Sequence, residues 1–165
     1  MFHKKCNLCN QKIKNIIMSI IYKTSLPHID EYFSLFETTG WNSDYCLTKD
    51  ELDLSLSNSY YTVSAYEDNK LVGFGRIVSD GVIHAMIYEM IVDPDYQGEG
   101  IGSNILNMLV EKCLKNKIRD IQLFCAKGKK VFYERHGFTA RDNNAPGMQY
   151  KKETPEAFKD FIGQI

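Results

Sequence analysis

The sequence lacks the features that mark membrane-spanning, secreted and nucleic-acid-binding proteins. Its 165 residues contain no run of about eighteen apolar residues, the length that a membrane helix needs. The apolar segment Ile16–Tyr22 is short and has no small-residue cleavage site after it. The 20 basic and 21 acidic side chains give a net charge of −1, so no overall field would hold nucleic acid or an anionic membrane. We therefore expect a cytoplasmic protein that has no nucleic-acid or membrane partner.

The cysteines also show no spacing that is typical of disulfide-bonded or zinc-binding proteins. The five cysteines are an odd number, and only Cys6 and Cys9 are closely spaced, so no disulfide framework is predicted. Cys6-x-x-Cys9 resembles half of a zinc site, but no second Cys-x-x-Cys or His-x-x-x-His pair completes it. We expect no metal, and a solvated basic tail at this end of the chain.

The remaining composition is that of an ordinary globular domain, with 44% hydrophobic, 12% aromatic and 25% charged residues. Residues 1–17 are rich in Lys and Asn and show no period. We predict a basic N-terminal extension over 1–17, either disordered or upstream of an alternative start at Met18. Residues 18–165 are predicted to be one domain, because their length fits a single compact core.

Hydrophobic periodicity and turn residues predict a mixed α/β chain. A short strand near 20–23 precedes helices at 26–36 and 48–57, the second with Thr48 as N-cap and Glu51 in a capping box. Three strands at 60–66, 71–78 and 82–92 then predict an antiparallel meander. The expected remainder is a helix to about 117, a strand 120–125, a helix 128–136 ended by Gly137, and a last β segment at 148–151.

The turn between the strand ending at Val92 and the following helix is rich in glycine. It reads Gln97-Gly98-Glu99-Gly100-Ile101-Gly102-Ser103. Such a turn at a helix start points free backbone N–H groups at one place, where the helix dipole favours a pyrophosphate. The segment has no Gly-Lys-Ser/Thr, which a P-loop needs, and Ser103 stands where a dinucleotide fingerprint needs glycine.

The same segment resembles the Gln/Arg-x-x-Gly-x-Gly/Ala acyl-CoA motif of the GNAT acetyltransferases. The preceding Ile91–Tyr96 looks like that family's strand and loop entering the motif, and Val131–Phe138 is similar to its Phe-Tyr-x-x-x-Gly-Phe segment. The resemblance covers roughly residues 18–152 and implies that the predicted domain, residues 18–165, is an N-acetyltransferase domain. It implies a twisted, mostly antiparallel sheet, splayed at the acyl-CoA site and flanked by helices.

The resemblance also implies how acetyl-CoA would be held as co-substrate. Backbone N–H groups of the glycine-rich turn would bind the pyrophosphate; these belong to Gln97, Gly98, Glu99, Gly100, Ile101, Gly102 and Ser103. Main-chain groups of Met90, Ile91 and Val92 would pair with the pantetheine amides like an added strand and hold the thioester carbonyl.

Two side chains are the candidate acid and base. Tyr133 matches the family tyrosine that protonates the departing thiolate, and the alternative is a plain aromatic core residue. Glu89 stands eight positions before Gln97, where many relatives carry an acidic residue, and is the candidate base for the amine. Strict alternation would place it on one strand face with Ala85, Ile87 and Ile91, and its alternative role is a salt bridge at the sheet edge.

Other residues near these segments have simpler expected roles. The lysine cluster at 127, 129 and 130 is expected to be a solvated helix face, with a CoA phosphate contact as the alternative. Cys125 is expected to be a buried, inert thiol, and the alternative is an acyl-cysteine route with His136. Arg76 and Asp80 are candidates to recognise a charged acceptor.

These patterns predict an N-acetyltransferase that moves the acetyl group of acetyl-CoA directly to a primary amine. The acceptor, a small-molecule amine or a protein or peptide amine, is not specified; the resemblance places its pocket near Gly40-Trp41 and residues 143–148. One alternative is a non-catalytic acyl-CoA-binding sensor on the same fold. Another is an interaction module recruited through the lysines of residues 1–17, and a homodimer stays open.

Overall fold

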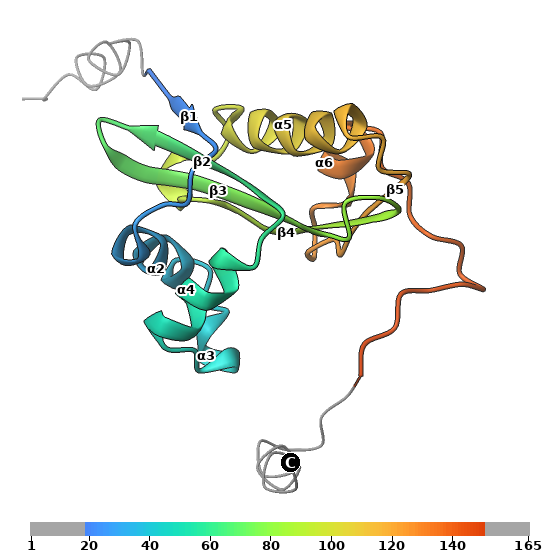
Figure 1. The fold of residues 1–165 in the computed structure, drawn as a ribbon, viewed down its shortest axis with the longest axis horizontal. Helices are drawn as coiled ribbons and strands as arrows, with labels where there is room; N and C mark the ends of the chain where they lie inside the picture. Colours follow the sequence, from blue (N-terminus) through green and yellow to red (C-terminus); the bar gives the residue numbers. More distant parts are fainter. Residues whose placement is uncertain (1–18, 151–165) are drawn as a thin grey trace, which may run out of the picture. The chain divides into compact units, whose positions relative to one another are not determined.

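The computed structural model describes residues 19–150 of the chain (Figure 1). The chain divides into two compact units, one ending at Phe124 and the other beginning at Cys125, and each is described by itself. Within the described residues, no helix is long and apolar enough to cross a membrane. The Cys6-x-x-Cys9 pair lies outside these residues.

The first unit holds a five-stranded sheet. Its strands follow one another in the order of the sequence: β1 (Ile21–Lys23), β2 (Tyr61–Glu67), β3 (Lys70–Ser79), β4 (His84–Val92) and β5 (Asp120–Leu123). Strands β1 to β4 pair antiparallel, which confirms the predicted meander, while β5 pairs parallel to β4. The mixed, mostly antiparallel sheet flanked by helices is the fold class that the sequence predicts.

Helix α5 (Ile101–Lys115) covers one face of this sheet and connects β4 to β5 (Figure 1). Its apolar face, with Ile101, Ile105 and Leu109, is buried. Glycine makes the close packing on β3 possible, because a Cβ at Gly75 would lie 2.8 Å from Ile105 Cγ2 and 3.0 Å from Leu109 Cδ1. The identity of this strand residue therefore sets how near α5 approaches the sheet.

Helices α2 (Ile29–Glu37) and α4 (Lys49–Ser57) lie against the opposite face (Figure 1). The predicted capping box is present, since Thr48 caps α4 while the Glu51 carboxylate accepts from the Thr48 amide at 2.8 Å. The buried side chains of both helices form one core with the sheet: Tyr32, Leu35, Phe36, Leu52, Leu56, Tyr66, Leu71, Phe74 and Ile91. This core anchors the strand that carries the candidate site.

Several local predictions were wrong. The short helix α3 (Asn42–Tyr45) and the single turn η1 (Pro94–Tyr96) were not predicted, because elements of this length show no period. Strand β5 ends at Leu123. Helix α6 (Lys130–Glu134) begins later than expected because Gly128, at φ 79°, precedes it, and it also ends earlier than expected, at Glu134. Residues 148–150 form no strand.

Candidate active site

The glycine-rich turn leads from η1 directly into α5. Gly98 and Gly100 have φ values of 86° and 83°, and Gly100 occupies the N-cap position without a side chain that could cap the helix. A Cβ at either position would meet no atom within 4 Å. Glycine is therefore needed here for its backbone conformation, and the space in front of the turn is open.

The amide groups of this turn are free. Among the residues that the structure describes, the N–H groups of residues 98–103 have no hydrogen-bond acceptor, and the first amide of α5 with a partner is that of Asn104, 3.0 Å from the Gly100 carbonyl. A row of free amides at the positive end of a fifteen-residue helix is a site for an anion. The geometry thus fits the phosphate-binding role predicted for residues 98–103, whereas the Gln97 amide donates to the Pro94 carbonyl at 3.5 Å and is not part of the free row.

Replacing Gly100 by valine is expected to weaken acetyl-CoA binding by about tenfold or more, because a β-branched residue at a φ of 83° forces the amide row to turn. Isothermal titration calorimetry with acetyl-CoA measures this. Gly100→Asn is the matched comparison, since asparagine tolerates left-handed backbone. Gly81→Val places the same strain, at a φ of 77°, in the β3–β4 turn and should leave affinity unchanged. An unchanged affinity for Gly100→Val would place the phosphate site elsewhere.

The approach to the turn is held by Asp93. Its carboxylate accepts from the Asp95 amide at 3.0 Å and pairs with the Lys70 ammonium at 2.9 Å. Burial acts to raise the pKa of Asp93, but the Lys70 ammonium and the Asp95 amide outweigh it and hold that pKa below its usual value. Asp93 therefore stays charged and ties the end of β4 to the start of β3.

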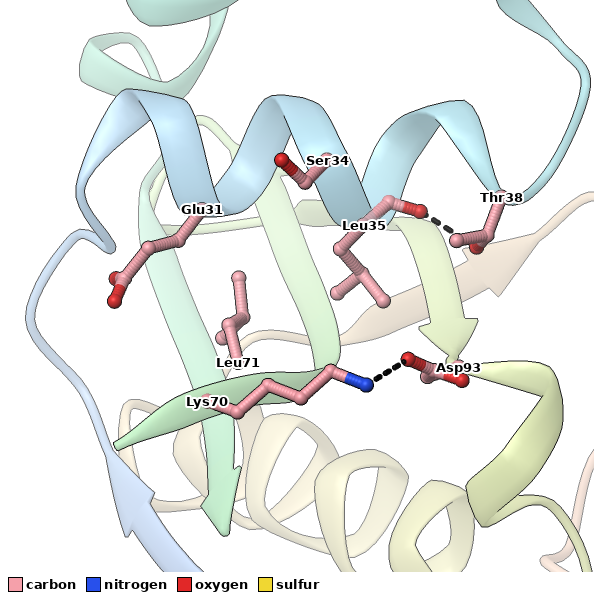
Figure 2. Close-up of a pocket in the computed structure, with 7 residues that line it drawn as sticks. All are labelled: Glu31, Ser34, Leu35, Thr38, Lys70, Leu71 and Asp93. Carbon is pink, nitrogen blue, oxygen red and sulfur yellow. Dashed lines mark hydrogen bonds and ion pairs between the residues drawn. The ribbon is translucent and has the colours of Figure 1, made fainter. Parts of the chain in front are cut away.

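This ion pair forms one wall of a pocket of about 340 Å³ (Figure 2). Its other walls come from α2 and from the start of β3. The lining residues are Glu31, Ser34, Leu35, Thr38, Lys70, Leu71 and Asp93. No pattern in the sequence indicates this pocket, because its lining joins segments far apart in the chain.

The second half of β4 has an edge without a strand partner. β5 pairs with β4 only from His84 to Ile87, so among the described residues no strand pairs with the outer edge of residues 88–92. This divergence is the splay that the family resemblance implies, and Met90, Ile91 and Val92 lie along it. The Gln97 side chain donates to the Val92 carbonyl at 3.1 Å, so the turn is tied to this edge.

Glu89 lies in a bulge of β4. Phe74 pairs with Ile91 and Arg76 with Tyr88, so that two residues of β4, Glu89 and Met90, stand opposite Gly75 alone. The φ of Glu89 is 52°. The extra residue interrupts the alternation of side chains between the two faces of the strand.

The predicted common face of Glu89 with Ala85 and Ile87 is therefore wrong. Ile87 pairs with Ile77, two residues from Gly75, which places it on the α5 face. After the bulge, Ile91 packs into the core under α2 and α4, and the Glu89 side chain points to that same face. Only the part of the prediction that joins Glu89 with Ile91 is confirmed.

The Glu89 carboxylate is held at both oxygens. Arg76 Nη2 donates to Oε1 at 2.7 Å, and the Tyr32 hydroxyl donates to Oε2 at 2.5 Å. Burial, and after it the Glu89 carboxylate, raises the pKa of Tyr32, so this hydroxyl keeps its proton. Glu89 thus forms a salt bridge, its predicted alternative role, but does so with Arg76 of the neighbouring strand β3, and both side chains are mostly buried. A carboxylate has further lone pairs, so the ion pair is compatible with a role as base.

Two candidates for acceptor recognition have internal roles. Arg76, with a side chain only 12% exposed, also donates to the Ser55 carbonyl at 2.8 Å. The Asp80 carboxylate accepts from the amides of Val82, Ile83 and His84 in the β3–β4 turn. Both side chains therefore stabilise the fold around the bulged strand.

Tyr133 belongs to the second unit, on α6. Its ring packs edge-on against Phe132 and Phe138, and burial, followed by the Cys125 side chain, raises the pKa of its hydroxyl. The hydroxyl therefore carries a proton at neutral pH, as a general acid must. The predicted glycine ending of this helix is confirmed, since Gly137 has a φ of 86° and the Phe138 amide reaches back to the Tyr133 carbonyl.

The remaining predictions for this segment had mixed outcomes. Cys125 is exposed, not buried, because β5 ends before it. Lys130 pairs with Glu134 one turn along α6 at 3.5 Å, as on a solvated helix face.

A mixed, mostly antiparallel sheet, splayed beside a glycine-rich helix start and flanked by helices, is the architecture that the family resemblance implies. Comparison with known protein families identifies the family: residues 34–147 match the family described as acetyltransferase (GNAT) domain. The chain belongs to this family of acetyltransferases, as the resemblance predicts.

Individual proteins similar to this chain are acetyltransferases by name. An uncharacterised N-acetyltransferase, ycf52, of Pyropia yezoensis is 28% identical over 88% of this chain and 85% of its own. GCN5-related N-acetyltransferase 2, chloroplastic, of Arabidopsis thaliana is 37% identical, over 50% of this chain and 32% of its own. A GNAT-family acetyltransferase of Streptococcus pneumoniae has a solved structure with a TM-score of 0.67 and 26% identity, covering 82% of this chain and all of that protein.

Proposed function

We propose that this acetyltransferase uses acetyl-CoA as donor and a primary amine as acceptor. The observation that carries the proposal is the row of free amides at residues 98–103, at the start of α5 and tied through Gln97 to the unpaired edge of β4. This combination suits a ligand with a pyrophosphate at one end and an amide-containing arm. A structural neighbour from Clostridium acetobutylicum, with a TM-score of 0.60, was solved with acetyl-CoA.

The proposed reaction is a direct transfer. The amine nitrogen attacks the thioester carbonyl, the carbon–sulfur bond breaks, and the developing oxyanion is held by main-chain donors from residues 90–92. Glu89 accepts the proton that the amine loses, directly or through a water molecule, and Tyr133 donates its phenol proton to the departing thiolate. Glu89 then releases its proton to solvent, solvent returns a proton to Tyr133, and no acyl-enzyme forms.

The proposed acceptor is a small-molecule amine or an amine of a peptide or protein. Trp41, 37% exposed and edge-on to Phe36, is an aromatic surface on the predicted acceptor loop. We likewise propose a cytoplasmic location, a homodimer, and no nucleic-acid or membrane partner. Relatives named chloroplastic point to a plastid as the other location to test by imaging of the tagged full chain.

Acetyl-CoA at about one hundred times its dissociation constant is expected to raise the melting temperature by roughly 5–10 °C, because a ligand that binds only the native state stabilises it by about 2.7 kcal/mol. Differential scanning fluorimetry measures the shift. ADP at the same concentration is the control for unspecific phosphate binding and should give a much smaller shift. No shift at millimolar acetyl-CoA would contradict the donor assignment.

The non-catalytic sensor is distinguished by product formation. An enzyme releases free CoA thiol only when a suitable amine is added, which a thiol-reactive dye detects in a screen of acceptors. A sensor would show the thermal shift and no thiol release with any amine.

A further inference from the structure

Glu89 has an unusual backbone for its place in the fold. Among the described residues, the other non-glycine residues with positive φ lie in turns or after helices: Cys46, Asp68, Asn69 and Lys117. Glu89 alone of these lies inside a strand. A left-handed backbone is energetically unfavourable for any residue that has a Cβ. It persists only where surrounding contacts enforce it.

The contacts that enforce it come from both neighbouring layers. Tyr32 on α2 is fully buried, with its ring edge-on to Phe74 at 4.7 Å, so its hydroxyl is presented to Glu89 from a fixed position. Arg76 on β3 is fixed in turn by the Ser55 carbonyl of α4. The Glu89 carboxylate is thereby connected to α2, α4 and β3 at once.

Without the bulge, these contacts are impossible. Regular alternation would turn Glu89 to the α5 face, where Gly75 lies under the apolar side chains of Ile105 and Leu109. A carboxylate among those side chains would have no partner. The Tyr32 and Arg76 contacts therefore favour the bulged register, in which Met90 lies beside Gly75 on the α5 face, its Sδ 2.9 Å from the place of a Gly75 Cβ.

We propose that Tyr32 and Arg76 are positioning residues, which act through the Glu89 side chain to hold the left-handed bulge and thus to set the Met90–Val92 edge that receives the donor. The inference rests on the proposed acetyl-CoA site and extends it to residues that do not touch the donor. It separates two roles of Glu89, one of its carboxylate as a proton acceptor and one of its anchored side chain as a conformational lock.

A pair of Glu89 variants tests this conformational lock. Both remove the carboxylate, but only glycine tolerates the left-handed backbone. Glu89→Gly adopts positive φ freely, whereas Glu89→Ala relaxes towards a regular strand that the donor must bend back. We expect Glu89→Ala to bind acetyl-CoA about five- to tenfold more weakly than Glu89→Gly by calorimetry. With a verified acceptor, both variants should lose turnover to a similar degree, since neither has the base.

Tyr32→Phe and Arg76→Met test the positioning residues themselves. Each is expected to weaken acetyl-CoA binding by about fivefold, and adding Glu89→Gly to either should restore the affinity to that of Glu89→Gly alone, because glycine no longer needs the tether. A purely structural loss would not be rescued. Lys49→Met, which removes the exposed ion pair with Asp30, is the matched control and should leave affinity unchanged.

The outcomes are distinct. Equal affinities of the Ala and Gly variants, within twofold, or a Tyr32→Phe defect that Gly does not rescue, would overturn the lock while leaving the donor assignment intact. Absence of acetyl-CoA binding to the wild-type chain would instead remove the proposed function. If Glu89→Ala does not fold by circular dichroism, the conservative Tyr32→Phe and its Gly double variant carry the test.

Discussion

Tyr133→Phe is expected to lower turnover by about two orders of magnitude while acetyl-CoA affinity stays within a few-fold. The substitution keeps the ring, and so its packing against Phe132 and Phe138, and removes the proton that the hydroxyl would donate to the thiolate. The loss should reside in kcat. It is measured by steady-state kinetics with a verified acceptor, under conditions in which chemistry limits the rate.

A donor with a more acidic thiol provides the internal check, because a better leaving group depends less on protonation and should shrink the defect. Tyr150→Phe, at a tyrosine of the same unit that is 91% exposed, is the control for loss of a phenol and should keep wild-type turnover. Wild-type turnover in Tyr133→Phe would remove this residue from the mechanism and leave the proton to water or to another side chain.

Gly75→Val is expected to lower the free energy of unfolding by about 3 kcal/mol, the upper part of the range for overpacked cores. Its Cβ alone would lie 2.8 Å from Ile105 Cγ2 and 2.9 Å from Met90 Sδ, so α5 must move away from β3. Urea denaturation followed by circular dichroism measures the loss. Because Met90 lies on the proposed donor edge, acetyl-CoA affinity should fall as well.

A second substitution tests whether the loss of stability comes from the collision with α5. Gly75→Ala combined with Ile105→Ala should cost at least about 1 kcal/mol less than the sum of the two single variants, because Ile105→Ala removes the nearest of the atoms with which the added Cβ collides. Additive costs, or a Gly75→Val variant as stable as the wild type, would mean that the helix does not pack on this glycine.

Local signals were sufficient for much of the fold. Thr48 and Glu51 predict the start of α4 because a capping box depends on groups three residues apart. The turn residues between β2, β3 and β4 predict the meander for the same reason, and Gly98 and Gly100 mark the turn before α5 because only glycine adopts their backbone without strain. Elements of a single turn, such as α3 and η1, are too short to show a period.

Local signals did not determine the face of the sheet to which the Glu89 side chain points. Period-two alternation assigns it to the side of Ile87, and the sequence contains no glycine or proline at that point to announce a bulge. The bulge depends on Tyr32 and Arg76, 57 and 13 residues away, which meet the carboxylate only when α2 and β3 pack against β4. The sequence by itself therefore determined the family, the meander and the amide-bearing turn, which depend on neighbouring residues. Only the tertiary structure decided where the candidate base points, because its partners come from distant parts of the chain.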